Sequence, residues 1–283
     1  MKQQFTGIDE IERSLQKDRR FHEKLVSPFT RAVSRYELLC PGDQVAVCIS
    51  GGKDSMLMAK LFQILMRHGK FRFGLEFVVM DPGYAPENRA LIEENAKKLL
   101  LPIRIFESRI FDAVDHIPKN PCYLCARMRR GYLYRYAKDL GCNKIALGHH
   151  YDDVIETILM SMLWAGQYQT MMPKLHSTNF EGMELIRPMY LIREEDIIDW
   201  TKKMNLTFLR CACHFTENCS SVSEDGTSAS KRAETKQLIR TLRKTNPYVE
   251  ANLFKSAENV NLDRVIAWKK DLAAHSFLEE YRD

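Results

Sequence analysis

A glycine-rich hexapeptide, Ser50–Ser55 (SGGKDS), combines residue types that are suited to binding an anion. The apolar run Val45–Ile49 before it predicts a buried strand, and apolar residues at helical spacing from Met56 to His68 predict a helix after it. A turn through two glycines into a helix exposes free backbone N–H groups and the positive end of the helix dipole. Lys53 adds a flexible cation, and the two serines add hydroxyl donors. The hexapeptide therefore predicts a phosphate-binding loop.

Cysteines form a second group of residues with chemical potential. Cys122 and Cys125 make a CxxC motif, Cys211 and Cys213 lie close together further along the chain, and Cys219 follows in a serine-rich run where we expect no ligand. Four thiolates can close a zinc site, whereas three can hold a [4Fe–4S] cluster and leave one iron open to a ligand. The spacing fits both, so zinc remains the alternative. The other cysteines, which lie beside apolar residues, are expected in or near the core: Cys40, Cys48 and Cys142.

Acidic residues follow two of the predicted strands. The strand Lys144–Gly148 leads into two histidines and then Asp152 and Asp153 at a helix start, where acids often serve only as caps. The strand Leu75–Met80 leads into Asp81 and a Pro-Gly turn. Open α/β sheets bind ligands at the carboxyl ends of their strands. These strand ends are therefore expected to lie beside the phosphate-binding loop.

Strands alternate with helices along this part of the chain, with a further helix at Glu87–Leu100 and a further strand at Ile103–Phe106. The alternation predicts an α/β fold built on a doubly wound parallel sheet. We expect an N-terminal helical segment over residues 1–38, which Pro28 breaks into two pieces. A domain with the phosphate-binding loop and the CxxC motif follows over residues 39–205. A C-terminal segment with the later cysteine pair and a basic helix follows over residues 206–283.

Composition sets the broad class. The chain has 283 residues, of which 45% are hydrophobic and 28% charged, as is typical of a soluble globular protein. No uninterrupted apolar stretch approaches the ~20 residues that cross a bilayer, and the N-terminus lacks the apolar core of a signal peptide. We therefore expect no membrane partner, a cytoplasmic location and reduced cysteines. The net charge of +5 permits a nucleic-acid partner without requiring one.

Two basic stretches are candidates for binding RNA. The first follows the CxxC motif and interleaves arginines with Tyr132, Tyr134 and Tyr136, on which splayed RNA bases could stack. The second repeats a basic residue every four positions from Arg232 to Lys244, and a solvated helix surface explains it about equally well. The residues expected to contact RNA are Arg127, Arg129, Arg130, Arg135, Lys236 and Arg240.

The hexapeptide differs from the Walker A loop and from the Rossmann fingerprint, and it resembles the pyrophosphate loop of the PP-loop ATPases. The segment GHHYDD at 148–153 is similar to the GHHxDD element of the same family. Together with CYLCARMRRG at 122–131, these motifs resemble the tRNA 2-thiocytidine biosynthesis family, a PP-loop branch with an iron–sulfur cluster. PKL at 173–175, RP at 187–188 and the helix start at Arg193 also fit, and the resemblance runs from about Phe29 to Tyr248.

This resemblance implies a fold of the PP-loop (adenine nucleotide alpha hydrolase-like) type, which binds ATP with Mg²⁺ and cleaves it between the α and β phosphates. The implied catalytic residues are Lys53, Asp54 and Asp152. The implied ATP-binding residues are Ser50, Gly51, Gly52, Lys53, Asp54, Ser55, Met80, Asp81 and Gly148. Met80 and Asp81 are expected near the adenine and Gly148 beside the nucleotide. Asp54 or Asp152 is expected to bind Mg²⁺.

The resemblance also assigns roles to the cysteines. It implies that Cys122, Cys125 and one later cysteine hold a [4Fe–4S] cluster whose fourth iron is free to take sulfide. The later element departs from the family pattern, which has a proline before Cys-x-x-Cys, because this chain has Arg210 before a tighter Cys-Ala-Cys. We expect Cys213 to be the third ligand, with Cys211 as the alternative.

The implied function is that of an ATP-dependent tRNA-cytidine 2-sulfurtransferase. Such an enzyme adenylates the C2 oxygen of a cytidine in the tRNA anticodon loop and replaces that oxygen with sulfur. The expected partners are tRNA, a sulfur donor such as a cysteine desulfurase or sulfide, and a second copy of the chain in a homodimer.

Two other functions remain open. One is another PP-loop tRNA-modifying enzyme, acting on a different thiolated base or as a lysidine-type ligase, with a structural zinc site. The other is a non-catalytic module that binds a nucleotide, or a zinc-stabilised module that binds tRNA. Binding alone would not need Lys53, Asp54 and Asp152 together, which favours an enzyme.

Overall fold

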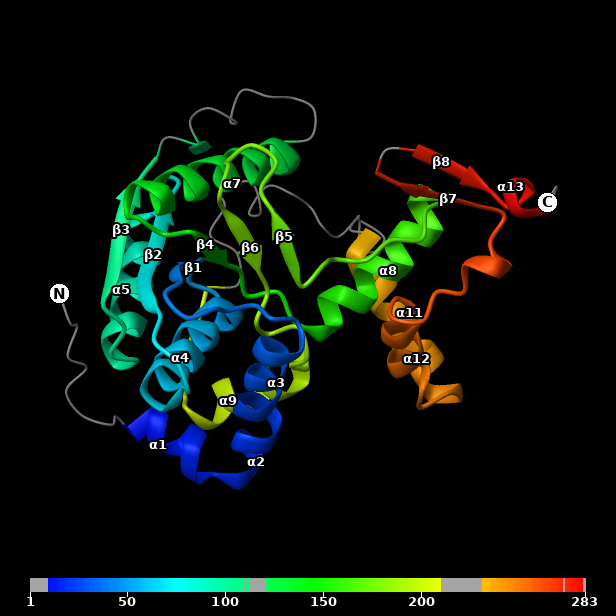
Figure 1. Ribbon diagram of the computed structural model, residues 1–283. Coiled ribbons are helices and arrows are strands. Elements are labelled where there is room, and N and C mark those ends of the chain that lie inside the picture. Colours follow the sequence, from blue (N-terminus) through cyan, green and yellow to red (C-terminus); the bar gives the residue numbers. More distant parts are fainter. Residues whose placement is uncertain (1–9, 109, 112–120, 210–230, 272, 282–283) are drawn as a thin grey trace. The chain divides into compact units, whose positions relative to one another are not determined.

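The computed structural model describes residues 10–108, 110–111, 121–209, 231–271 and 273–281 (Figure 1). Contacts divide the chain into two compact units. Unit 1 comprises Met1–Val154 and Met171–Ser230, and unit 2 comprises Ile155–Thr170 and Lys231–Asp283. Among the described residues, no helix is both long enough and apolar enough to cross a membrane. The three-part division expected from the sequence stays a prediction beside these contact units.

Unit 1 is built on a six-stranded sheet in the order β3-β2-β1-β4-β6-β5. The strands are β1 (Gln44–Ile49), β2 (Gly74–Asp81), β3 (Ile103–Glu107), β4 (Lys144–Ala146), β5 (Lys174–His176) and β6 (Glu184–Ile186). All neighbours pair in parallel except β5, which pairs antiparallel with β6 at the edge. The helices between these strands are α4 (Lys53–His68), α5 (Pro86–Lys98) and α7 (Pro121–Asp139), while α8 (Tyr151–Ala165) follows β4 and α9 (Glu194–Lys203) follows β6. The predicted doubly wound α/β sheet is confirmed.

Helices cover both faces of this sheet because alternate residues of the central strands are apolar on both sides (Figure 1). On one face, Val45 and Val47 of β1 pack in a core with residues of α4, α5, α9 and the N-terminal helices. On the other face, Ala46 and Cys48 of the same strand pack in a second core with Tyr134 of α7. The order of the strands reverses direction at β1, so the carboxyl end of β1 is the expected place for a ligand.

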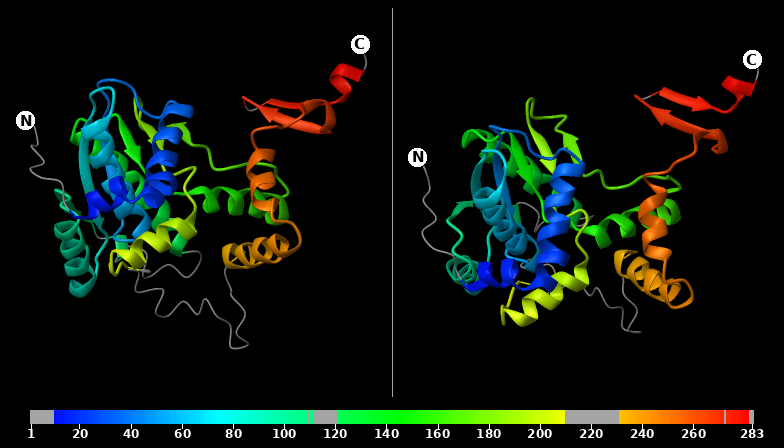
Figure 2. Two further views of the ribbon diagram at one scale, coloured as in Figure 1. Left: turned by 90° about the horizontal axis from the view of Figure 1, so that it is seen from below. Right: turned by 60° about the horizontal axis from the view of Figure 1, so that its bottom comes forward.

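The N-terminal segment is helical from Glu10 and includes α1 (Glu10–Lys17), α2 (Arg19–Phe21), a π-helical turn η1 (His22–Val26) and α3 (Ser27–Arg35). Figure 2 shows these helices lying beside α9, which η1 contacts. The prediction that Pro28 breaks the segment was wrong. Pro28 lies in the first turn of α3, where a missing N–H costs little, and the interruption falls instead at Asp18, whose carboxylate caps Arg20.

Unit 2 joins the later part of α8 to the C-terminal elements. These elements are α11 (Lys231–Thr245), α12 (Val249–Ser256), the 3₁₀ turn η2 (Leu262–Arg264), the antiparallel ribbon of β7 (Ala267–Lys270) and β8 (Ala273–Ser276), and α13 (Leu278–Tyr281). Arg232 of α11 forms an ion pair with the buried Glu156 of α8 at 3.0 Å. The predicted basic helix is therefore present as α11, and part of its charge holds the helix in place.

A buried ionic cluster connects the N-terminal segment to α4. Glu12 and Lys60 are both fully buried, with 3.7 Å between Glu12 Oε2 and Lys60 Nζ, and Arg67 donates a hydrogen bond to the same carboxylate. Lys60 also donates to Gln63 Oε1 at 3.1 Å and to the carbonyl of Leu99 at 3.0 Å. These bonds satisfy its donors, but Glu12 supplies the charge that balances Lys60 in the core.

We predict that Glu12→Ala lowers the free energy of unfolding by about 3–5 kcal/mol, because it leaves a buried ammonium group without its counter-charge. Urea denaturation followed by circular dichroism measures the change. Glu23→Ala is the matched control: it removes an exposed pair with Arg19, and such pairs contribute only about 0–1 kcal/mol. Equal shifts for the two variants would contradict this account of the cluster.

Candidate nucleotide-binding site

A cavity of about 310 Å³ lies at the carboxyl ends of β1, β2 and β4. Residues of the phosphate-binding loop, of the segments after β2 and β4, and of α7 form its walls. They are Cys48, Ile49, Ser50, Asp54, Ser55, Met80, Tyr84, Arg129, Leu133, Leu147, Gly148, His149 and Asp153. The structure thus brings together the strand ends that the sequence predicted to meet.

The loop turns because Gly51 adopts a left-handed conformation, with φ of +83°. A Cβ at this position would lie 2.7 Å from the side chain of Ile92, so the position is both strained and crowded for other residues. Gly52 is extended, with φ of −78°, and is the N-cap of α4 without a side-chain hydrogen bond to the helix. The first N–H groups of α4 are therefore free of a side-chain cap, as an anion site at a helix N-terminus requires.

The two loop serines differ in what they can offer a ligand. Ser55 is buried, and its Oγ accepts the N–H of Ser50 at 3.1 Å and donates to the carbonyl of Gly52 at 3.0 Å. The Ser55 hydroxyl therefore holds the loop in shape from inside. Ser50 is exposed, and its Oγ lies 3.2 Å from Ser55 Oγ. Of the two predicted donors, Ser50 is therefore the better placed to donate a hydrogen bond to a ligand.

Lys53 begins α4 and is held between two carboxylates. Its Nζ lies 3.0 Å from Asp54 Oδ1 and 3.3 Å from Glu194 Oε1. Burial alone would lower the pKa of Lys53, but the charges and hydrogen bonds of Asp54 and Glu194 outweigh it and raise that pKa. The ammonium group is therefore charged and positioned beside the loop, as its predicted role requires.

The paired acids after β4 have different partners. Asp152 accepts the N–H of Glu194 at 2.7 Å and hydrogen bonds from Arg193 at 3.2 and 3.4 Å, so it caps α9. Asp153, which was not among the predicted site residues, lines the cavity and accepts the N–H of His150 at 3.0 Å. In this structure Asp152 orients the helix that carries Glu194, and Asp153 is the carboxylate that faces the cavity.

Gly148 makes the close approach of β4 to the loop possible. A Cβ on Gly148 would lie 3.1 Å from the backbone nitrogen of Ser55 and 3.2 Å from the carbonyl carbon of Asp54. Backbone atoms at this distance cannot move aside as a flexible side chain can. Gly148 also lines the cavity, in agreement with its predicted place beside the nucleotide.

The end of β2 contributes one wall of the cavity. Met80 is buried and lines the wall, whereas the carboxylate of Asp81 accepts the N–H groups of Gly83 at 2.9 Å and Tyr84 at 2.7 Å. Asp81 thus shapes the turn that carries Tyr84 into the cavity wall. Cys48 also reaches the cavity, but burial, together with neighbouring Cys142, raises its pKa to about 12, so its thiol is protonated at neutral pH.

The CxxC motif lies at the start of α7, with the backbone of Cys122 and Cys125 within one helical turn. The intervening Leu124 and the following Met128 pack against a buried cluster that contains Met80. The start of α7 is therefore attached to the cavity wall. The predicted third ligands Cys211 and Cys213, and also Cys219, lie outside the described residues. Of the other cysteines, Cys48 and Cys142 are buried as predicted.

One cysteine prediction was wrong. Cys40 is exposed, because it follows the N-terminal helices in the segment that leads into β1. Among the residues that the structure describes, no group of three or more histidine, cysteine or acidic side chains is placed to hold a metal ion.

The first predicted RNA-binding stretch is only partly exposed. Tyr134 is buried and stacks on Phe180, and Tyr136 stacks on Phe106 with ring centroids 4.1 Å apart. The Tyr134 ring is buried in unit 1, so the expectation that it stacks on RNA bases was wrong, and Phe106 covers one face of the half-buried Tyr136. Tyr132 is 42% exposed. The arginines of this stretch divide in the same way: Arg127, Arg130 and Arg135 are exposed, while Arg129 lines the cavity.

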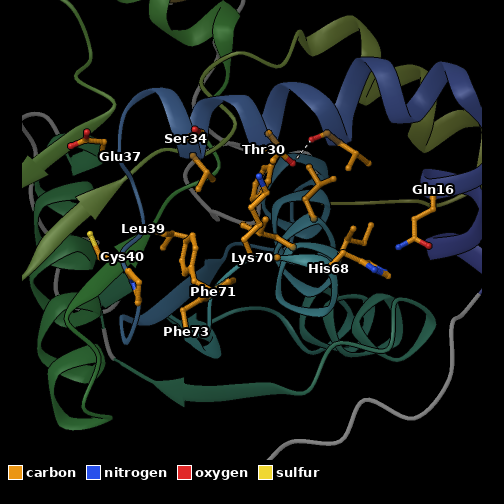
Figure 3. A pocket seen from close by; sticks show the side chains of 18 of the residues that line it. Gln16, Thr30, Ser34, Glu37, Leu39, Cys40, His68, Lys70, Phe71 and Phe73 are labelled. Atoms are coloured by element: carbon orange, nitrogen blue, oxygen red, sulfur yellow. Dashed lines mark hydrogen bonds between the residues drawn. The ribbon is translucent and has the colours of Figure 1, made fainter.

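On the second predicted stretch, Arg240 is exposed and Lys236 is half-buried. A larger cavity, of about 830 Å³, lies near the amino ends of β1 and β2, where the segment before β1 meets the end of α4 (Figure 3). Figure 3 shows Leu39, Cys40, Phe71 and Phe73 along its wall. It contains none of the predicted site residues, so the smaller cavity is the candidate site.

Comparisons with known proteins show the family of the chain. The family model of the PP-loop domain matches residues 20–213. The tRNA-cytidine(32) 2-sulfurtransferase 2 of Francisella tularensis is 35% identical over 242 residues, which cover 84% of this chain and 92% of that protein. The chain belongs to the PP-loop family, in its tRNA-cytidine 2-sulfurtransferase branch. The tRNA-cytidine(32) 2-sulfurtransferase of Coxiella burnetii is 34% identical over 247 residues, which cover 86% of this chain and 92% of that protein.

A solved structure supports the fold of this PP-loop protein. The U34-tRNA thiolase NcsA from Methanococcus maripaludis, solved with its [4Fe–4S] cluster, superposes with a TM-score of 0.63 at 19% sequence identity. The superposition covers 82% of this chain and 76% of that one. At this identity the likeness shows a shared architecture.

Several residues of the candidate site were not predicted from the sequence. Glu194 and Arg193 come from a segment far along the chain, and their only sequence signal was the helix start at Arg193. His150 was part of the GHHYDD motif, yet its position was unexpected: its buried ring lies 3.6–3.9 Å from oxygens of Asp54, Asp152 and Asp153. These placements depend on tertiary packing.

We predict that Gly148→Ala weakens ATP binding by about tenfold, because overpacking against backbone typically costs about 1–3 kcal/mol and here it displaces the loop. Isothermal titration calorimetry with ATP measures the effect. Gly131→Ala is the matched control, since a Cβ there meets nothing within 4 Å and alanine favours the helix. Unchanged ATP affinity in Gly148→Ala would show that the contact between β4 and the loop does not shape the site.

Proposed function

We propose that this chain is an ATP-dependent tRNA sulfurtransferase that makes 2-thiocytidine. In this reaction the C2 oxygen of a cytidine in the tRNA anticodon loop attacks the α-phosphate of ATP, and pyrophosphate leaves. Sulfur then replaces the adenylated oxygen and AMP departs. The relatives named above, which are similar over most of the chain, support this substrate and reaction.

One structural observation carries the proposal. The helix that begins with the CxxC motif packs, through Leu124 and Met128, on the same cluster as Met80, and Met80 lines the cavity beside the phosphate-binding loop. The helix that begins with the thiol motif thus packs beside the candidate nucleotide site. A thiolase needs this arrangement, because the activated base must receive sulfur before water hydrolyses the adenylate.

The loop residues would bind the phosphates. The uncapped N–H groups of α4 and the charged Lys53 would stabilise the negative charge that develops on the leaving pyrophosphate. Met80 would contact the adenine from the end of β2. Mg²⁺ would be held chiefly by the phosphate oxygens, with Asp54 and the cavity-lining Asp153 as protein ligands. Asp152, predicted for this role, would act instead by capping α9.

The sulfur site would be formed by Cys122, Cys125 and one of Cys211 or Cys213. Thiolates are the ligands of both iron–sulfur clusters and structural zinc, so the donor set fits either. A [4Fe–4S] cluster with three protein ligands would supply an iron site at which sulfide is held. The residues that line the neighbouring cavity would bind and orient ATP and the cytidine.

The exposed arginines of α7 and the exposed Arg240 of α11 would contact the tRNA phosphates. Arg127, Arg130 and Arg135 follow the CxxC motif directly, so tRNA bound there would reach the sulfur site. The sulfur donor, either a cysteine desulfurase or free sulfide, and the homodimer stay predictions.

The test is the iron, sulfide and zinc content of protein purified without oxygen. We predict about four irons with inorganic sulfide per chain and a brown colour, with all three lost in Cys122→Ala and in Cys125→Ala. Cys40→Ala is the matched control, because Cys40 is exposed and lies before the amino end of β1. Zinc without iron under strict anaerobiosis would contradict the cluster and favour a structural metal.

A further inference from the structure

We propose that Arg129 is a catalytic residue that binds the α-phosphate of ATP, and not one of the arginines that hold the tRNA backbone. This inference rests on the proposed adenylyl transfer. It identifies the residue that would balance the negative charge of the α-phosphate. The loop and Lys53 account for the leaving pyrophosphate, but none of those residues accounts for the charge on the phosphorus that is attacked.

The position of Arg129 sets it apart from its neighbours in α7. Arg127, Arg130 and Arg135 are exposed, as residues that meet a large nucleic acid should be. Arg129 is half-buried and lines the cavity. Within the hexapeptide, Ser50, Asp54 and Ser55 line the cavity while Lys53 does not. The guanidinium group of Arg129 therefore brings a permanent positive charge to the cavity wall.

The surroundings of Arg129 leave its charge available. Its guanidinium carbon lies 5.3 Å from the ring centroid of Phe111, which supports the group from one side. Its Nε atom is buried and has no hydrogen-bond partner among the described residues. Two carboxylates line the same cavity: that of Asp54 is paired with Lys53, and that of Asp153 accepts the N–H of His150 at 3.0 Å. A buried donor without a partner is costly, so an acceptor that reaches it from the cavity would be stabilised.

Phosphate is the acceptor that best matches this donor. A guanidinium group presents N–H donors in a planar fork that fits two phosphate oxygens. Arg129 contacts Phe111, which packs in one cluster with Met80 and Tyr84, and so lies at the β2 side of the cavity, whereas the phosphate-binding loop lies at the end of β1. An ATP molecule would bind with its β and γ phosphates on the loop and its adenine at Met80. Its α-phosphate would then lie between the loop and the β2 side of the cavity, where Arg129 is.

The chemistry explains why a cation is needed there. The cytidine O2–phosphorus bond forms at the α-phosphate while the bond from that phosphorus to the α–β bridging oxygen breaks. The bonding electrons leave with pyrophosphate, and the non-bridging α oxygens keep their negative charge throughout. Arg129 would reduce the repulsion that this charge exerts on the attacking oxygen and would hold the adenylate after pyrophosphate has left.

Binding of AMP and of pyrophosphate to the full-length protein separates the two roles. AMP carries only the α-phosphate, and pyrophosphate occupies only the loop. We predict that Arg129→Gln weakens AMP binding by about 10- to 100-fold, as expected for the loss of hydrogen bonds to a charged group. Its affinity for pyrophosphate stays that of the unmodified protein. Arg127→Gln, two residues away on α7 and exposed, is the matched control and keeps both affinities while it weakens tRNA binding.

Each other outcome has a definite meaning. If Arg129→Gln binds AMP normally and loses tRNA affinity as Arg127→Gln does, Arg129 is a tRNA contact and the inference is overturned. If the unmodified protein binds neither ATP nor pyrophosphate, the proposed function fails instead. Arg129→Lys keeps the charge without the fork, so it should fold and recover part of the AMP affinity. Full loss of AMP binding in a stably folded lysine variant would show that the fork geometry, beyond the charge, is required.

Discussion

The uncapped N-terminus of α4 is the constraint on which the rest of the site depends. A helix that starts without a side-chain cap leaves several N–H groups unsatisfied, and this is stable only where an anion or water can reach them. The left-handed Gly51 makes that start possible by turning the chain directly out of β1. Ser55 then closes the turn with two hydrogen bonds, and Gly148 lets β4 approach the loop closely enough to share its cavity.

Charged side chains around the loop determine where the ammonium group of Lys53 lies. Asp152 caps α9, and α9 begins with Glu194, whose carboxylate reaches Lys53. The end of β4 and the segment after β6 are thereby coupled to the first turn of α4. The buried His150 lies among the acids around the loop. The arrangement positions Lys53 before any phosphate is bound, which lowers the cost of ordering it during binding.

The sequence was sufficient for the fold and for the location of the site. The predicted strands at Val45–Ile49, Leu75–Met80 and Ile103–Phe106 match β1, β2 and β3 to within two residues at each end. Apolar periodicity and the two glycines are local signals, and the carboxyl-end rule places a ligand relative to a parallel sheet without further information. The short strands β5 and β6 carried too few residues for such a pattern.

The roles of individual side chains could not be read from the same signals. Asp152 and Asp153 are adjacent and chemically identical, and only the packing of α9 decides which one caps a helix and which one faces the cavity. Likewise, the alternating arginines and tyrosines of α7 gave a uniform basic pattern in sequence. The sheet beneath them buries Tyr134 and turns Arg129 toward the cavity, because a helix has distinct faces.

The central claim is that the protein activates a cytidine of tRNA with ATP and then transfers sulfur to it. Its most direct test is mass spectrometry of nucleosides from unmodified tRNA incubated anaerobically with the protein, ATP, Mg²⁺ and sulfide. The account predicts a cytidine in the anticodon loop that is heavier by the difference between sulfur and oxygen, formed only with ATP and accompanied by AMP, and absent with Lys53→Ala. Consumption of ATP without thiolation, or thiolation of a base other than cytidine, would contradict it.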